Sequence, residues 1–159
     1  MTTDTAKPLS DLFDGGDTVM LMTMIGHEHT SRPMTIAGVD GDRLSMLVDS
    51  TAAWYGAVAS GTAVVHITLA DVRDNDYAAL NGTATVTTDR AEIDRLWSPA
   101  AGAFFEGKDD PHLAVLHFDV SDGEYWTSPS GRIGSLIAMA RAAVGGDEAA
   151  GEQGTIATS

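Results

Sequence analysis

Few side chains in this sequence could hold an anionic group, because acidic residues far outnumber basic ones. The formal net charge is −14 at pH 7, with 23 Asp and Glu against 9 Lys and Arg. A phosphate is bound by charge-assisted hydrogen bonds from cations, so a phosphorylated ligand would depend on those basic side chains. They are Lys7, Arg32, Arg43, Arg73, Arg90, Arg95, Lys108, Arg132 and Arg141. The same field repels phosphate backbones and anionic lipid, so we expect neither nucleic acid nor a membrane as a partner.

The sequence offers neither cysteines nor a clear set of metal ligands. The chain has no cysteine, which excludes disulfides, thiolate metal sites and cysteine nucleophiles and favours a reducing cytoplasm. His27, Glu28 and His29 lie in an expected turn without a third ligand nearby in the sequence, so we predict no metal site. Residues 1–10 lack the apolar segment of a secretory signal, and no apolar run is long enough to span a bilayer. We therefore expect a cytoplasmic protein.

The chain alternates short apolar runs with turn signals, and helical segments are inserted between them. Gly15-Gly16, Asp40-Gly41 and Asp122-Gly123 are typical of turns or helix ends. Residues 98–111 are expected to be irregular. The expected strands are 17–25, 31–39, 43–48, 62–69, 77–87, 113–120 and 124–127, and the expected helices are 6–13, 51–59, 89–97 and 133–144.

This pattern favours an antiparallel barrel with peripheral helices over a parallel sheet. We predict a mainly β fold, a six-stranded antiparallel split β-barrel with short helices, in one domain over residues 1–146. Residues 147–159 are expected to form a flexible C-terminal tail.

Two motifs resemble a known family. The first runs from Leu96-Trp97 through an aromatic pair and Gly107-Lys108-Asp109-Asp110-Pro111 to Glu124-Tyr125-Trp126. The second is Arg32-Pro33-Met34 on the second expected strand. Over about residues 10–146 the sequence resembles the general stress protein branch of the pyridoxamine 5'-phosphate oxidase-like family.

The resemblance implies a split-barrel homodimer that binds FMN in a groove between the subunits, while related branches bind a deazaflavin or haem there. Arg32 would answer the phosphate-binding arginine of the family, and Trp126 would reach the ring edge from the second subunit. The residues that the resemblance places at the cofactor are Arg32, Pro33, Met34, Thr35, Val48, Asp49, Trp54, Trp126 and Arg132.

The sequence departs from the family pattern at the phosphate. Val48, Ala52 and Trp54 stand where the family carries a threonine, a serine and a lysine. Losing a charge-assisted partner costs a phosphate about 1.5–3 kcal/mol, so FMN binding is expected to be weakened. Trp54 could instead stack on a ring or pack in the barrel or at the dimer interface. Gly134 and Leu136 replace a histidine and an arginine of the pyridoxamine phosphate oxidases, which argues against pyridoxamine phosphate as substrate.

Three functions follow from these observations. The first is a flavin- or deazaflavin-dependent oxidoreductase acting on a small molecule. The second is a dimeric protein that binds a flavin-like ligand without turnover, and the third is a structural dimer with a degenerate site. A dimer is expected because a single barrel cannot bury all of its large apolar side chains, and a monomer would expose them. They are Trp54, Tyr55, Phe104, Phe105 and Trp126.

Overall fold

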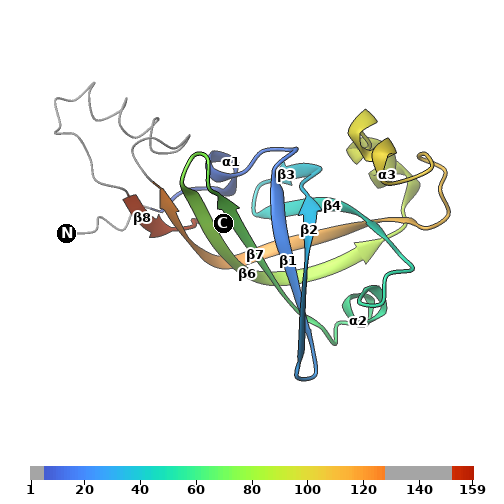
Figure 1. Cartoon of the computed structure of the whole chain (residues 1–159), viewed down its shortest axis with the longest axis horizontal. Coiled ribbons are helices and arrows are strands. Elements are labelled where there is room, and N and C mark those ends of the chain that lie inside the picture. Colours follow the sequence, from blue (N-terminus) through green and yellow to red (C-terminus); the bar gives the residue numbers. More distant parts are fainter. Residues whose placement is uncertain (1–5, 128–151) are drawn as a thin grey trace.

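A computed structural model describes residues 6–127 and 152–159 of the chain (Figure 1). Its strands form one antiparallel sheet in the order β2-β1-β5-β6-β7-β4-β3, with β8 on β7. The expected mainly β architecture is confirmed, with eight strands in place of the six of the predicted barrel. The strands are β1 Thr18–Ile25, β2 Glu28–Thr35, β3 Gly38–Asp40, β4 Arg43–Asp49, β5 Val64–Asp71, β6 Asp76–Thr87, β7 Leu113–Thr127 and β8 Glu152–Thr155.

The two longest strands, β6 and β7, pair along most of their length and shape the barrel. A register shift between Asn81 and Gly82 interrupts the ladder, and such bulges bend and twist a strand. A Cβ added at Gly82 would collide with the carbonyl oxygen of Asp119 on β7. The residue at this bend must therefore be glycine.

The predicted hairpin turn at Asp122-Gly123 is wrong, because β7 continues through it without a break. Asp122 pairs with Asn81, and Gly123 pairs with Leu80. A Cβ on Gly123 would lie 2.8 Å from the carbonyl oxygen of Ala79. This glycine serves the close approach of two strands rather than a turn.

Two clusters of apolar side chains lie on opposite faces of β4 and β7. The larger one fills the barrel and includes Leu44, Met46 and Val48 from β4. The smaller one packs α3, Arg90–Leu96, against the outer face of the sheet through Ile93 and Leu96. Because strand residues alternate between faces, β4 contributes to both clusters.

The helices are few and short. α3 matches the helix expected over residues 89–97, whereas α1 is Leu9–Leu12 and α2 is Tyr55–Ala59, both shorter than expected. The segment expected to be irregular contains one 3-10 helix, Pro99–Ala103. The helix expected over residues 133–144 lies outside the described residues. Within the described ranges, no helix is long and apolar enough to cross a membrane.

The C-terminal residues differ from the loose tail expected for them. Residues 152–155 form β8, which pairs with β7 from Glu124 to Thr127. This stretch of β7 is available because β4 pairs with β7 only up to Asp119. Ser159 then bonds to the carboxylate of Asp42.

Candidate functional site

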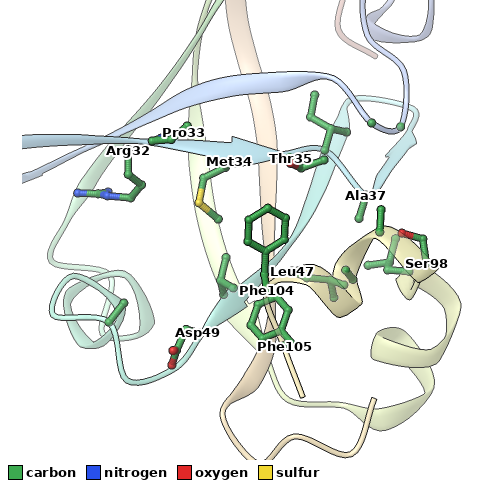
Figure 2. Close-up of a pocket in the computed structure, with 18 of the residues that line it drawn as sticks. Arg32, Pro33, Met34, Thr35, Ala37, Leu47, Asp49, Ser98, Phe104 and Phe105 are labelled. Carbon is green, nitrogen blue, oxygen red and sulfur yellow. The ribbon is translucent and has the colours of Figure 1, made fainter. Parts of the chain in front are cut away.

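A cavity of about 690 Å³ lies between β2, β4 and the segment that follows α3 (Figure 2). Pockets of 300–1,000 Å³ with mainly apolar walls are the usual form of a small-molecule site. The lining residues here are mostly apolar, and the ionisable ones are Arg32 and Asp49. The cavity is therefore the candidate site in the described part of the chain.

The structure brings together most of the residues that sequence analysis assigned to a cofactor. The lining includes Arg32, Pro33, Met34 and Thr35 from β2, Val48 and Asp49 from β4, and Trp54 before α2. Trp126 does not line the cavity, since it pairs with Tyr77 and Gln153 at the other end of β7. Arg132 lies outside the described residues. The cofactor roles of all of them stay predictions.

Sheet register explains how β2 presents its side chains. β2 is an edge strand that pairs only with β1 among the described strands. Pro33 is therefore tolerated, because an edge strand need not use every backbone donor. Arg32 and Met34 alternate as half-buried residues between more exposed neighbours. Their periodicity places both on the face that turns toward the cavity.

Arg32 is held at its place by neutral groups. Its Nη1 and Nη2 each donate to Thr23 Oγ1 at 3.1 Å, and Nη2 also donates to Thr30 Oγ1 at 2.6 Å. The guanidinium lies 5.1 Å from the ring centroid of Trp54, which is a cation–π contact. Burial lowers the pKa of Arg32, but an arginine remains charged at neutral pH.

Asp49 is the second charged residue of the cavity. Its Oδ1 accepts hydrogen bonds from the hydroxyl of Thr51 at 2.6 Å and from the backbone N–H of Thr51 at 2.8 Å. These bonds lower the pKa of Asp49 below its ordinary value, so the carboxylate is ionised at neutral pH. Figure 2 shows Arg32 and Asp49 on the side of the cavity toward α2, away from Ser98.

The opposite wall comes from a segment that sequence analysis did not assign to the site. Phe104 and Phe105 follow the 3-10 helix and line the cavity together with Leu47 and Leu96. Phe104 is 77% exposed, which is unusual for so large an apolar side chain. The signal in the sequence was an aromatic pair in a segment expected to be irregular.

The cavity can bind a flat apolar group at one end and a polar or charged tail at the other. Leu47, Met34 and the two phenylalanines provide apolar surface, and Arg32 and Asp49 provide one donor group and one acceptor group. Hydroxyls of Thr35 and Ser98 complete the polar lining that the structure describes, in which there is no histidine.

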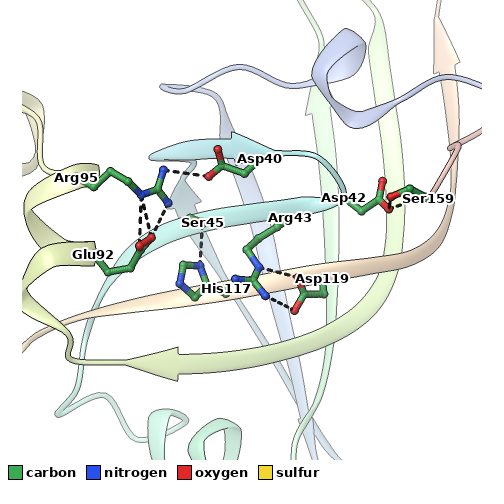
Figure 3. A network of polar contacts seen from close by, with 9 residues as sticks. All are labelled: Asp40, Asp42, Arg43, Ser45, Glu92, Arg95, His117, Asp119 and Ser159. Atoms are coloured by element: carbon green, nitrogen blue, oxygen red, sulfur yellow. Dashed lines mark hydrogen bonds and ion pairs between the residues drawn. The ribbon is translucent and has the colours of Figure 1, made fainter.

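The five histidines of the chain, all of them in its described part, lie outside the cavity lining. Among the described residues, no group of three or more His, Cys, Asp or Glu side chains could hold a metal ion. His66 Nδ1 lies 2.9 Å from Asn81 Oδ1 on the next strand. His117 is buried on the outer face of β7, where its Nδ1 lies 2.8 Å from Ser45 Oγ (Figure 3).

Charged pairs surround His117 beneath α3. Arg43 donates to both carboxylate oxygens of Asp119, at 2.7 and 3.1 Å. Arg95 of α3 donates to Glu92 and reaches Asp40 at 3.0 Å (Figure 3). Burial lowers the pKa of His117, and the nearby Arg43 lowers that pKa further. Of these pairs, Arg95–Asp40 joins α3 to β3.

Comparisons with known proteins give a consistent picture. Residues 4–150 match the family model described as pyridoxamine 5'-phosphate oxidase like. Among solved structures, the chain is similar to one named general stress protein 26 from Jannaschia sp. CCS1, with 27% identity and a TM-score of 0.67 over 92% of each chain.

A second similar structure is the general stress FMN/FAD binding protein from Xanthomonas citri. It is 31% identical, with a TM-score of 0.61, over 70% of this chain and 80% of that one. The general stress protein 26 from Bacillus anthracis str. Sterne, at 18% identity and a TM-score of 0.64 over 73% and 88%, shares the fold. No curated protein matches the chain.

Proposed function

Because this chain belongs to the pyridoxamine 5'-phosphate oxidase-like family, in its general stress protein branch, we propose that its cavity binds a flavin-type cofactor. The observation that carries the proposal is the meeting of β2, β4 and Trp54 at one mainly apolar cavity. A relative at 31% identity is an FMN/FAD binding protein, which supports the same ligand class.

The wall residues fit the ring of a flavin. Phe104, Phe105 and Met34 offer apolar and aromatic surface on which a flat ring can stack. Phe104 leaves 77% of its surface exposed without a ligand, and a stacked ring would cover it. FMN is the flavin that the family resemblance implies, and a deazaflavin, which presents a similar flat ring, is the alternative.

The tail end of the cavity, which is the side with Arg32 and Asp49, fits a phosphate less well than the apolar walls fit a ring. Among the described lining residues Arg32 is the one cation, and Trp54 stands where the family pattern has a lysine. The proposed site therefore holds the ring through apolar contacts and the tail through Arg32. Pyridoxamine phosphate is not the proposed substrate, since the sequence lacks the histidine and arginine noted above.

The proposed assembly is a cytoplasmic homodimer. The outer face of the sheet leaves Met20 41%, Val64 55% and Tyr77 37% exposed, and exposed apolar patches commonly mark contacts between chains. A second copy would cover this surface and would complete the cavity with Trp126. Sedimentation at micromolar concentration tests this assembly, and a monomer at that concentration would contradict it.

We propose hydride transfer as the chemistry, because that is what a bound flavin supplies. The residues of this chain would bind and orient the ring and exclude water from it. A protein that binds flavin without turnover is the second candidate. The part of the lining that the structure describes has no histidine, which favours this candidate, since proton transfer to a substrate would need another group.

Titration of the purified protein with FMN, followed by the quenching of flavin fluorescence, tests the proposed binding. We expect saturable binding of one flavin per chain, and Phe104→Ala should weaken it. Val72→Ala, at a side chain 72% exposed outside the cavity, is the matched control. No saturation with FMN, riboflavin or a deazaflavin would refute the proposed function.

Turnover is tested separately on the flavin-loaded protein. NADH or NADPH is added without oxygen, and bleaching of the flavin absorbance is followed. A rate well above that of free flavin supports an oxidoreductase, while an equal rate supports binding without turnover.

A further inference from the structure

We propose that the cavity selects an unphosphorylated flavin, riboflavin, over FMN and FAD. The inference rests on the proposed function and names its ligand more narrowly. It comes from the charges and the hydrogen bonds at the tail end of the cavity, where Arg32 and Asp49 lie on the same side (Figure 2).

The first argument is the local charge. Arg32 and Asp49 are the ionisable lining residues in the described part of the chain, and their formal charges cancel. A phosphate monoester carries about −1.5 to −2 charges at pH 7. Transferring it into this cavity would strip its water without supplying a net positive charge, which is unfavourable. A neutral ribityl chain avoids this cost.

The second argument concerns the donors of Arg32. A guanidinium recognises phosphate best as a fork, with two parallel N–H bonds. Both Nη atoms already donate to Thr23 Oγ1, and Nη2 also donates to Thr30 Oγ1. Trp54 covers one face of the group at 5.1 Å. A bidentate phosphate contact would have to displace these bonds, whereas a single contact to a hydroxyl would not.

The third argument is the acceptor that Asp49 provides. An ionised carboxylate only accepts hydrogen bonds, and a phosphate dianion does the same. The two groups therefore repel each other and cannot bond. A ribityl hydroxyl can donate to Asp49 and can accept from Arg32, so it complements both residues. The Thr51 bonds hold Oδ1 of Asp49 in place for this contact.

Fluorescence titrations of the full chain with riboflavin, FMN and FAD test the proposal. We expect riboflavin to bind at least tenfold more tightly than FMN. Asp49→Asn keeps the shape of the side chain and removes its charge, so it should improve FMN binding and reduce the preference at least threefold. Asp11→Asn changes the net charge equally on an exposed residue of α1 and should leave the preference unchanged.

Four results would overturn the inference. FMN binding as tight as riboflavin or tighter would refute it and leave the proposed function standing. An equal change of preference in Asp49→Asn and Asp11→Asn would show that the charge of the whole chain, not Asp49, sets selectivity. If FMN binds more tightly and Arg132→Ala abolishes this advantage, Arg132 supplies the missing cation. Failure of every flavin to bind refutes the proposed function as well.

Discussion

Charged side chains are held differently at the two ends of β4. At its start, Arg43 is paired with Asp119, and nearby Arg95 is paired with Glu92 and Asp40. At its end, Asp49 is bonded to Thr51, while Arg32 of the neighbouring β2 is bonded to threonine hydroxyls. Within the described residues, no ion pair joins either of these two to an opposite charge.

The difference separates charges that stabilise the fold from charges available to a ligand. The charge of a side chain in an ion pair is already engaged by its partner and is less available to a ligand. Neutral hydroxyls orient Arg32 and Asp49 without cancelling their charges, so both can still interact with a bound molecule. Hydroxyl-held charges beside an apolar cavity therefore mark the candidate site more clearly than ion pairs do.

The largest expected effect is at Arg32. Arg32→Ala should weaken FMN binding at least tenfold, because a charge-assisted bond of about 1.5–3 kcal/mol is lost. The free energy of unfolding should change much less, since the Thr23 and Thr30 hydroxyls already hydrogen-bond to each other at 3.1 Å and keep that bond without Arg32. Parallel titration of Arg73→Ala, at an exposed arginine, is the control. Equal affinity of Arg32→Ala and the unaltered protein would place the ligand elsewhere.

A smaller effect is expected when a cation is added to the cavity. Trp54→Lys should raise FMN affinity about tenfold, because it supplies the cation that the family pattern has at this position and this chain lacks. Riboflavin affinity should not rise, since that ligand carries no phosphate. Calorimetry with both ligands measures the two changes. A similar gain for both would mean that Trp54 obstructs the cavity rather than lacking a charge.

Much of this architecture follows from the sequence, but the site only in part. Apolar alternation and turn residues located most strands, and the Arg32-Pro33-Met34 motif located one wall of the cavity. The hydrogen bonds from Arg32 to Thr23 and Thr30 depend on the register of β1 against β2, which the sequence does not specify. A 3-10 helix places Phe104 and Phe105 at the site, and such a short helix has no strong sequence pattern by which it could be predicted.

The errors at the C-terminal end of the sheet have a common physical reason. Asp122-Gly123 is a turn signal only when the chain reverses, and here the partner strand β6 is long enough to continue pairing. Residues 152–155 lack apolar alternation, so nothing local predicts a strand. They form β8 because β7 extends beyond its pairing with Arg43, at the start of β4, and offers unpaired backbone groups there.

A third effect is a dependence of stability on pH, which we expect from His117 near the ion pairs at the start of β4. Burial keeps the pKa of His117 lower in the folded protein than in the unfolded chain. The unfolded chain therefore binds more protons as the pH falls below about 6.5, and stability should decrease by no more than about 1.4 kcal/mol per pH unit. Urea unfolding between pH 7.5 and 5 measures this loss. The groups facing His117 are Arg43, Glu92, Asp119 and Arg95.

The control for this pH effect is His117→Asn, which keeps a polar atom near the position of Nδ1 for Ser45 and does not titrate. The variant should flatten the pH dependence above pH 5. His112→Asn, at an exposed histidine, should keep it. If both variants retain the full dependence, the titrating group is not His117.

The smallest effect is expected at the Arg43–Asp119 pair, although its geometry is good. The bidentate contact at 2.7 and 3.1 Å would suggest a strong interaction. The side chains are however 43% and 46% exposed, and solvent screens such pairs so that they contribute about 0.2–1 kcal/mol. A double-mutant cycle of Arg43→Ala and Asp119→Ala, measured by urea unfolding, should give a coupling energy in this range that falls with added salt. FMN affinity should not change, because neither residue lines the cavity. A coupling energy well above about 1 kcal/mol would contradict the expected solvent screening of this pair. A loss of flavin binding would show that the two ends of β4 are not independent.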